Sequence, residues 1–335
     1  MLKNKIKLNK KDKEILFYLD MDARSPLSYI AKKTKLSKQV VKYRIERLIK
    51  NGVIEKFLLF INGTKLGYVA YKFYIQFQNI IEEKLDEIIR ELEDHPLIVW
   101  VATCEGNYDL AIAPIARNNV HAFSILNELL VKYNEYIQDI LPLNYIDVSH
   151  MKKVHMTEFN RDQIGAPFWG NEPEKYELDD YEIQILSILS EEARKPIIEI
   201  AKEIGCSVDI VNTRLKKLLK EGIIQGSTII MNRFKTGFEY HKLLLKIRFY
   251  SDKEETFFLE FVKSEDNITD IIRMMGSWNY ELDIEVKDIY EFHELMLRLR
   301  NKFPTNIKSY DSLMILKEHK LNFFPMKTLL KEIVK

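Results

Sequence analysis

Apolar residues in the first fifty positions recur at helical spacing in three short stretches. The stretches are predicted to run from Asn9 to about Asp20, from Pro26, and from Lys38 to about Lys50. Ser37 precedes the third, and its hydroxyl can accept a hydrogen bond from a free backbone N–H at the helix start. The buried faces are formed by Ile15, Leu16 and Leu19, by Ile30 and Ala31, and by Val41, Ile45 and Leu48.

The residues after these helices predict a wing. Val53-Ile54, followed by Phe57 to Ile61, is expected to form two strands that turn near Asn62-Gly63. Three short helices and a wing indicate a winged helix-turn-helix, whose third helix lies in the major groove of DNA. A three-helix protein-interaction module with a solvated basic face is the alternative.

From Gly67 onward the pattern changes to a period of two and alternates with helical stretches. The order strand, helix, strand, strand, helix, strand predicts a ferredoxin-like domain with two helices on one face of an antiparallel sheet. Its expected elements are Val69 to Phe77, Glu82 to Leu92, Leu97 to Ala102, Leu110 to Ile115, Val120 to Lys132, and Ile137 to Val148.

The whole pattern then repeats at a constant offset of 170 residues. Leu8 matches Leu178, and Gly106 still matches Gly276. The predicted fold class is α+β, with two winged helix-turn-helix domains alternating with two ferredoxin-like βαββαβ domains. The expected domains are 1–64 and 178–235 for the winged helices, 65–158 and 236–335 for the ferredoxin-like domains, and 159–177 for a linker. In the linker, Phe168 and Trp169 suggest packing rather than free movement.

The two copies differ in charge. Residues 6–65 hold 15 Lys and Arg against 6 Asp and Glu, whereas residues 176–235 hold 9 against 10. A basic module gains DNA affinity by releasing phosphate counterions, so the first winged helix is predicted to be the main DNA reader. The expected DNA-binding residues are Ser37, Lys38, Gln39, Lys42, Tyr43, Arg44 and Arg47, with Asn212, Thr213, Arg214, Lys216 and Lys217 in the second copy.

The composition and the missing motifs argue against several other classes of protein. Cys104 and Cys206 are far apart, which argues against a disulfide framework or a zinc site and fits the cytoplasm. The sequence has no signal-peptide pattern and no apolar run of membrane-spanning length. Phosphate loops and nucleophile motifs are missing, so we expect no cofactor, metal or catalytic residue.

Several motifs together resemble the leucine-responsive regulatory protein/asparagine-operon regulator (Lrp/AsnC) family. They are LNKKDKEIL, SKQVVKYRIERLIKNGVI and CEGNYDLAI in the first copy, and LDDYEIQIL, SVDIVNTRLKKLLKEGII and MGSWNYELDI in the second. The resemblance implies sequence-specific regulation of transcription, with double-stranded DNA as partner. It also implies sheet-to-sheet pairing of the α+β domains, which we expect to occur within one chain, and two chains are expected to form a homodimer.

Small effectors, often amino acids, bind near the glycine turn in that family. By position, the resemblance points to Gly106, Asn107, Asp109, Gly276, Ser277 and Asn279. Asn279 replaces the acidic residue at Asp109, which puts recognition of an amino group there in question. The alternative is that the two glycines only permit tight turns.

Two other functions remain open. Sirohaem decarboxylases resemble two such units joined or paired, but the segments matching their site lack histidine, and only the second has an arginine, Arg273. The chain could also be an adaptor that contacts the transcription machinery. His150 and His155 have no acidic neighbour in sequence and are interpreted as surface or packing residues.

Overall fold

The computed structural model describes residues 5–159, 167–170 and 172–324. The remaining parts of the predicted terminal domains and of the predicted linker (1–4, 160–166, 171 and 325–335) lie outside the described residues. The first winged helix contains α1 (Lys10–Met21), α2 (Leu27–Thr34), α3 (Lys38–Lys50) and β1 (Ile54–Ile61). The second contains α6 (Asp180–Glu191), α7 (Ile197–Glu203), α8 (Val208–Lys220) and β7 (Ile224–Met231).

Side-chain caps set the starts of the first and third helices of each module, whereas α2 and α7 start after a proline. Asn9 accepts a hydrogen bond from the backbone N–H of Asp12, and the Asp12 carboxylate accepts one from the backbone N–H of Asn9, which forms a capping box. Ser37 accepts from the N–H of Val40 at 3.2 Å. The equivalent Ser207 caps α8 in the same way, so both third helices start at equivalent positions.

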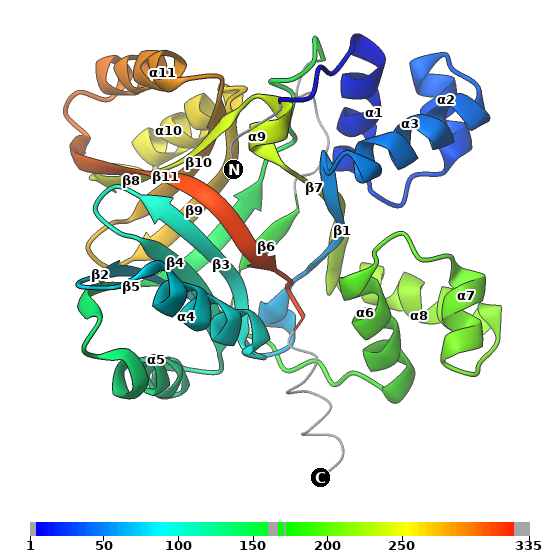
Figure 1. The fold of residues 1–335 in the computed structure, drawn as a ribbon, viewed down its shortest axis with the longest axis horizontal. Helices are drawn as coiled ribbons and strands as arrows, with labels where there is room; N and C mark the ends of the chain where they lie inside the picture. The colour runs from blue at the N-terminus through cyan, green and yellow to red at the C-terminus, as the bar shows by residue number, and fades with distance from the viewer. Residues whose placement is uncertain (1–4, 160–166, 171, 325–335) are drawn as a thin grey trace.

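The prediction of a separate two-stranded wing in each module was wrong. β1 is one continuous strand, and it pairs antiparallel with β7 of the other copy, from Ile54 opposite Met231 to Ile61 opposite Ile224. The predicted turn leads the chain forward instead, through a short 3-10 helix (Gly63–Lys65) that Asn62 caps. A lone edge strand leaves a row of backbone N–H and C=O groups unpaired. Here β1 and β7 pair, so each strand supplies hydrogen-bond partners for the backbone of the other. We call this pair the β1–β7 ribbon (Figure 1).

Each module is followed by an α+β domain in the predicted order. The first contains β2 (Val69–Phe77), α4 (Glu82–Asp94), β3 (Ile98–Glu105), β4 (Leu110–Ala116), α5 (Asn119–Tyr133) and β5 (Ile137–His150). The second contains β8 (Glu239–Ile247), α10 (Asp252–Ser264), β9 (Ile268–Met275), β10 (Tyr280–Val286), α11 (Ile289–Lys302) and β11 (Ile307–Leu321). The short helix α9 (Arg233–Thr236) joins β7 to β8, and β6 (Phe168–Gly170) pairs with β5.

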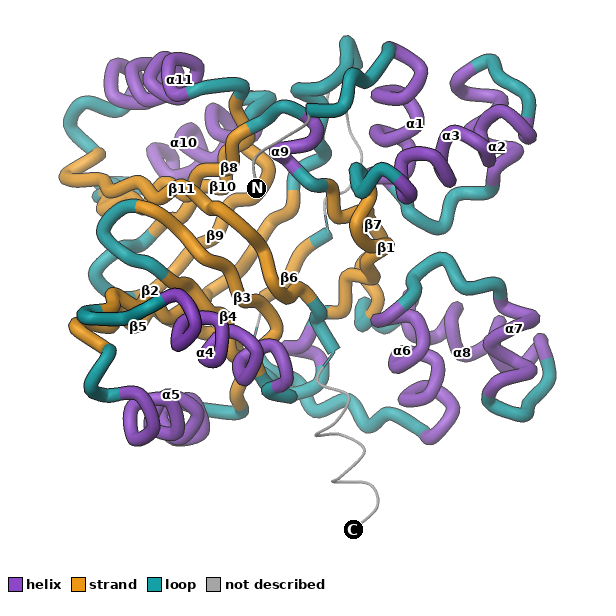
Figure 2. The backbone as a smooth tube through the Cα atoms, in the orientation of Figure 1, coloured by secondary structure: helices purple, strands orange, loops and turns teal. Residues whose placement is uncertain are grey.

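The two α+β domains pair within the chain, as expected. β5 begins on β2 of its own domain and continues along β9 of the other, while β11 begins on β8 and continues along β3. These crossings close eight of the described strands into a ring in the order β2-β4-β3-β11-β8-β10-β9-β5. The four long helices α4, α5, α10 and α11 lie on the outside of this closed sheet (Figure 2).

The strands of this closed sheet bury both faces. In β10, Tyr280, Leu282 and Ile284 belong to the core beneath the outer helices. The alternate residues Glu281 and Asp283 are also buried, although a period-two pattern with acidic residues ordinarily marks a solvent face. Closure therefore turns the polar face of the strand toward the interior, where it needs charged partners.

Candidate functional site

The outer face of α3 exposes four of the residues predicted to bind DNA. Lys38, Gln39, Lys42 and Tyr43 are exposed on it, and Tyr43 keeps 63% of its surface accessible. Ser37 is used as the helix cap. The exposed side chains lie in the first two turns, the part of a recognition helix that reaches base edges.

The two predicted arginines of α3 are held by the first helix. Arg44 and Arg47 each bind the same oxygen of buried Asp12 at 2.7 Å. Because this pairing joins α3 to the start of α1, both guanidinium groups contribute to the structure of the module. The lysines of α3 are thus more exposed than its two arginines.

The third helix of the second copy has a different surface. Arg214 binds Asp179 at 2.7 Å, and Lys217 binds buried Glu182 at 2.9 Å. Thr213 and Lys216 are exposed, Asn212 is half-buried, and exposed Asp209 stands in the first turn of α8. The positive charge available to a phosphate is lower on α8 than on α3.

Two equivalent hydrogen bonds, here called the Arg24–Arg194 clasp, fix the two modules relative to each other. The guanidinium of Arg24 donates to the backbone carbonyl of Ala193, and that of Arg194 donates to the carbonyl of Ala23 at 2.5 Å. These contacts are equivalent under the 170-residue offset. The clasp and the β1–β7 ribbon together set the separation of α3 and α8.

The two predicted glycine turns pack against the opposite domain. A Cβ at Gly106 would lie 2.9 Å from Leu313, and one at Gly276 would lie 2.6 Å from Leu143. Their φ angles are +139° and +151°, which L side chains rarely adopt. Glycine is therefore required by both the backbone and the interface at these turns.

The other predicted effector residues belong to the same turns. Asp109 accepts the backbone N–H of Phe77 at 2.7 Å, and Asn279 accepts the N–H of Ile247 at 2.8 Å. An amide fits the second turn because its nitrogen also donates to the carbonyl of Ile247 at 2.6 Å. Asn107 donates to Asp311 at 2.8 Å, and Ser277 is exposed.

A large cavity lies elsewhere, between the closed sheet and the β1–β7 ribbon, and none of those six residues lines it. It comprises about 1160 Å³, part of which is open to solvent. Most of its lining is apolar or aromatic, including Phe60, Trp100, Phe168, Trp169 and Phe323. The polar lining side chains include Lys72, Tyr145, His150, Lys153, Gln225, Thr228, Arg233, Tyr240, Lys242, Asp270, Asp283 and Glu318. Aromatic walls with a few convergent polar groups are typical of small-molecule sites.

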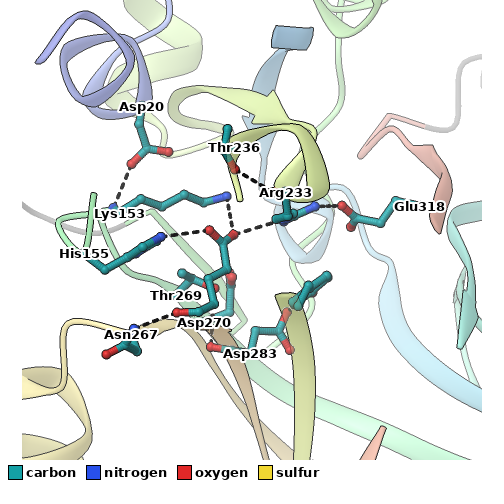
Figure 3. Close-up of polar contacts among 12 residues, drawn as sticks. Asp20, Lys153, His155, Arg233, Thr236, Asn267, Thr269, Asp270, Asp283 and Glu318 are labelled. Carbon is teal, nitrogen blue, oxygen red and sulfur yellow. Dashed lines mark hydrogen bonds and ion pairs between the residues drawn. The ribbon is translucent and has the colours of Figure 1, made fainter. Parts of the chain in front are cut away.

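One end of the polar lining is organised by buried Glu285. Lys153, His155 and Arg233 converge there from three different parts of the chain (Figure 3). Its carboxylate binds Lys153 at 2.8 Å, Arg233 at 3.0 Å and His155 at 3.2 Å. Arg233 also pairs with Glu318. Burial by itself would raise the pKa of Glu285, but the charges of Lys153 and Arg233, together with the contact to His155, outweigh it and hold the pKa well below its usual range. The carboxylate is thus ionised and stabilises the groups around it.

A second buried cluster lies around Lys242. Its ammonium binds Glu281 at 2.7 Å and Asp283 at 2.5 Å, and Glu281 also accepts the hydroxyl of Tyr74 at 2.6 Å. Lys72, the equivalent of Lys242 in the first copy, is 3.7 Å from Glu281, beyond hydrogen-bond distance. Burial lowers the pKa of Lys72 to about 7, against the opposing effect of Glu281.

His150 completes the lining. Its Nδ1 lies 2.8 Å from Asp270, while Nε2 is buried with no hydrogen-bond partner among the described residues. The ring packs against Phe60, with 4.8 Å between the ring centroids. Of the two interpretations offered for His150 and His155, surface or packing, packing is the one that holds, because both side chains are buried and lie against carboxylates that distant strands supply.

Sequence reasoning missed this cavity because its polar residues come from many elements of both copies, from Lys72 in β2 to Glu318 in β11. The segments compared with the enzymes contain Arg273, but that side chain pairs with Asp147 and Glu255 and does not line the cavity. One signal was available in the repeat. Glu281, Asp283 and Glu285 stand where the first copy has Ala111, Ala113 and Ile115, an apolar-to-acidic change on one face of one strand.

The fold and the comparisons define a protein with two winged helix-turn-helix modules. A family model described as winged helix-turn-helix DNA-binding matches residues 8–55 and 178–225. The HTH-type transcriptional regulator FL11 of Pyrococcus horikoshii is 31% identical over 115 residues, covering 34% of this chain and 75% of that protein. The HTH-type transcriptional regulator LrpA of the same organism is 30% identical over 125 residues, covering 37% and 87%.

This chain belongs to the Lrp/AsnC family of transcription regulators. Its function is DNA-binding transcription regulation of that type. Each of the two relatives matches little more than a third of this chain, which is about one of its two units.

A solved structure with the duplicated architecture was also found. The siroheme decarboxylase NirDL has a TM-score of 0.61, with 15% identity, covering 97% of this chain and 98% of that chain. At this identity the similarity is one of fold. Among the described residues, none of the helices is both long enough and apolar enough to span a membrane.

Proposed function

We propose that the chain binds a specific double-stranded DNA sequence mainly through its first winged helix. The observation that supports this most is the difference between the third helices. Lys38 and Lys42 are exposed on α3, whereas α8 has Val208 and Asp209 at the positions of Lys38 and Gln39. A carboxylate near the groove repels phosphate, although it can accept a hydrogen bond from cytosine.

The second module has a supporting role in this proposal. The contacts of Arg24 and Arg194 fix α8 relative to α3, so any contact that α8 makes with DNA lies at a set distance from the main one. Thr213 and Lys216 are its exposed candidates among the predicted residues. Association of two chains into a homodimer would present four winged helices, and light scattering tests that prediction.

Fluorescence anisotropy with operator fragments selected from genomic DNA tests the proposal. The variant Lys38→Ala/Lys42→Ala/Tyr43→Ala should bind about tenfold or more weakly, because two phosphate-neutralising charges are lost. Arg47 is left intact because it is bound to Asp12. The matched control is Lys216→Ala/Lys220→Ala on α8, which removes two exposed lysines. Undiminished binding by the α3 variant, or an equal loss in the control, would reject the proposal.

An enzymatic function is the second candidate. The fold similarity to NirDL and the presence of His150, Tyr145 and Arg233 in one cavity favour it. A titration with sirohaem, followed by visible absorption, tests it. Tight binding followed by release of carbon dioxide would support the enzyme, and an unchanged spectrum would exclude it. Cross-linking to RNA polymerase subunits without DNA would instead support the adaptor function.

A further inference from the structure

We propose that the cavity beneath the β1–β7 ribbon is an effector site for an aromatic carboxylic acid that has no amino group. This deepens the proposed function, since the ligand would act on the DNA-binding modules. The site is separate from the two glycine turns, whose predicted effector residues do not line the cavity. Three features of the lining carry the inference.

The first feature is the pairing of the charged groups. Each acidic side chain in the lining already has a basic partner: Asp270 has His150, Asp283 has Lys242 and Glu318 has Arg233. An incoming ammonium group would find no free carboxylate among these described side chains.

Lys72 is the exception among the basic groups. Its ammonium lies 3.6 Å from the centre of the Trp100 ring, and its carboxylate neighbour Glu281 is 3.7 Å away. Glu281 meanwhile has Lys242 and Tyr74 within 2.7 Å. A carboxylate from a ligand would give Lys72 the close partner that it lacks, and a buried charged pair of this kind forms strong hydrogen bonds.

The second feature is the free nitrogen of His150. The residue is 8% exposed, Nδ1 is held by Asp270, and Nε2 has no partner among the described residues. Buried polar atoms are almost always hydrogen-bonded, so an unpaired one in a cavity indicates a missing partner. With Nδ1 donating to Asp270, Nε2 can accept from an acid or ring N–H, and when protonated it can donate to an anion.

The third feature is the apolar lining. Phe60, Trp100, Phe168, Trp169 and Phe323 surround the polar groups, which favours a ligand with a flat apolar body. A site with this lining and a cationic anchor suits an aromatic acid better than a sugar or a nucleotide, which would need many more polar partners.

The ribbon connects this site to DNA. Leu58 and Phe60 of β1 and Thr228 and Ile230 of β7 line the cavity. β1 follows α3 after three residues, and β7 follows α8 after three residues. A ligand that contacts the ribbon can therefore favour one separation of α3 and α8 over another, which is what allosteric control requires.

Isothermal titration with three matched probes tests the ligand class: indole-3-acetate, indole-3-acetamide and L-tryptophan. They share the indole ring and differ in the acid and amino groups. Indole-3-acetate should bind at least about tenfold more tightly than the other two, because only it offers an unaccompanied carboxylate to Lys72. Comparable binding of all three, or no saturable binding of indole-3-acetate up to about 10 mM, would overturn the proposal.

Variants locate the site. Lys72→Met keeps the length of the side chain and leaves Glu281 paired with Lys242, so the chain should still fold, which circular dichroism checks. It should lose the preference for indole-3-acetate. Asn107→Ala, at the glycine turn outside the cavity, is the control and should bind as the unaltered chain does. Loss of binding in Asn107→Ala with retention in Lys72→Met would move the site to the turn and overturn the proposal.

The two proposals fail separately. A chain that binds DNA but not indole-3-acetate rejects the cavity site and leaves the DNA proposal standing. A chain that binds indole-3-acetate but no DNA rejects the DNA proposal and leaves the cavity site standing. Where both bind, saturating indole-3-acetate should change the affinity for DNA at least about fivefold, and an unchanged affinity would reject control through the ribbon.

Discussion

Replacing Glu285 with glutamine would remove the carboxylate that Lys153, Arg233 and His155 share, while keeping the size of the side chain. Removing one partner of a buried ion pair commonly costs about 3–5 kcal/mol, because the other charge is left without compensation. Arg233 keeps Glu318, and the new amide oxygen can still accept a hydrogen bond. We therefore expect a loss near the lower limit, about 3 kcal/mol of unfolding free energy.

Urea unfolding at pH 7, followed by circular dichroism at 222 nm, measures this loss. Glu87→Gln is the control, because Glu87 binds Lys84 at 2.7 Å on the surface, where solvent screens the pair and its loss should change stability little. The double variant Glu285→Gln/Lys153→Met should recover part of the stability, since the uncompensated ammonium is removed as well. A loss in Glu285→Gln no larger than in the control would refute the assignment of Glu285 as the centre of the cluster.

The pH dependence provides an independent check on the same residue. The pKa of Glu285 is well below its usual value of 4.5 in the folded chain. The unfolded chain therefore binds the proton more readily, and the stabilisation is present above pH 4.5 and is lost as the pH falls further. The difference between the unaltered chain and Glu285→Gln should shrink below pH 4.5, and a difference that grows there would contradict the sign.

Three further results are expected. Gly276→Ala should lose about 1–3 kcal/mol of stability by thermal unfolding, because a Cβ there would lie 2.6 Å from Leu143 at a φ of +151°; an unchanged midpoint would show that the turn relaxes freely. Iodoacetamide should modify Cys206 rapidly and Cys104 slowly, because burial raises the pKa of Cys104 to about 12; peptide mass spectrometry showing equal rates would contradict this. Burial lowers the pKa of Lys72 from 10.5 to about 7 in the folded chain. The unfolding free energy should therefore rise between pH 7 and pH 10.5, by up to about 1.4 kcal/mol per pH unit. If Lys72→Met shows the same dependence of unfolding free energy on pH as the unaltered chain, this lysine is not the source.

Local patterns were enough to predict the three helices of each winged module and the order of elements in each α+β domain. The helix start at Ser37, the βαββαβ order and the 170-residue repeat all depend on neighbouring residues or on direct comparison of the two copies. The prediction of the wing was wrong because local sequence patterns do not show which strand a given strand pairs with. Residues from 54 to 61 have strand character, but their pairing partner is 170 residues away, and pairing between distant segments is set by the tertiary fold.

The cavity could be predicted least. Lys72, Glu281 and Glu285 alternate with apolar residues, and that alternation ordinarily predicts one buried and one solvated face. Both faces are buried here because the strands close on themselves through β5 and β11. Whether an alternating polar residue faces water or an interior partner depends on this closure, which the separate strands do not reveal.

The fusion of two units in one chain explains how the charged residues around the cavity can differ between the two copies. In a symmetric dimer of identical units, each acidic residue of β10 would appear twice, together with two copies of the lysine beside it. Here the two equivalent lysines, Lys72 and Lys242, both approach Trp100, but the acids occur only in the second copy, where the first has alanines. Lys242 is within hydrogen-bond distance of both Glu281 and Asp283, whereas Lys72 is within hydrogen-bond distance of neither. Duplication followed by divergence therefore leaves one under-paired cation per chain, so a titration with indole-3-acetate should saturate at one site per chain, and two equivalent sites would contradict the asymmetry.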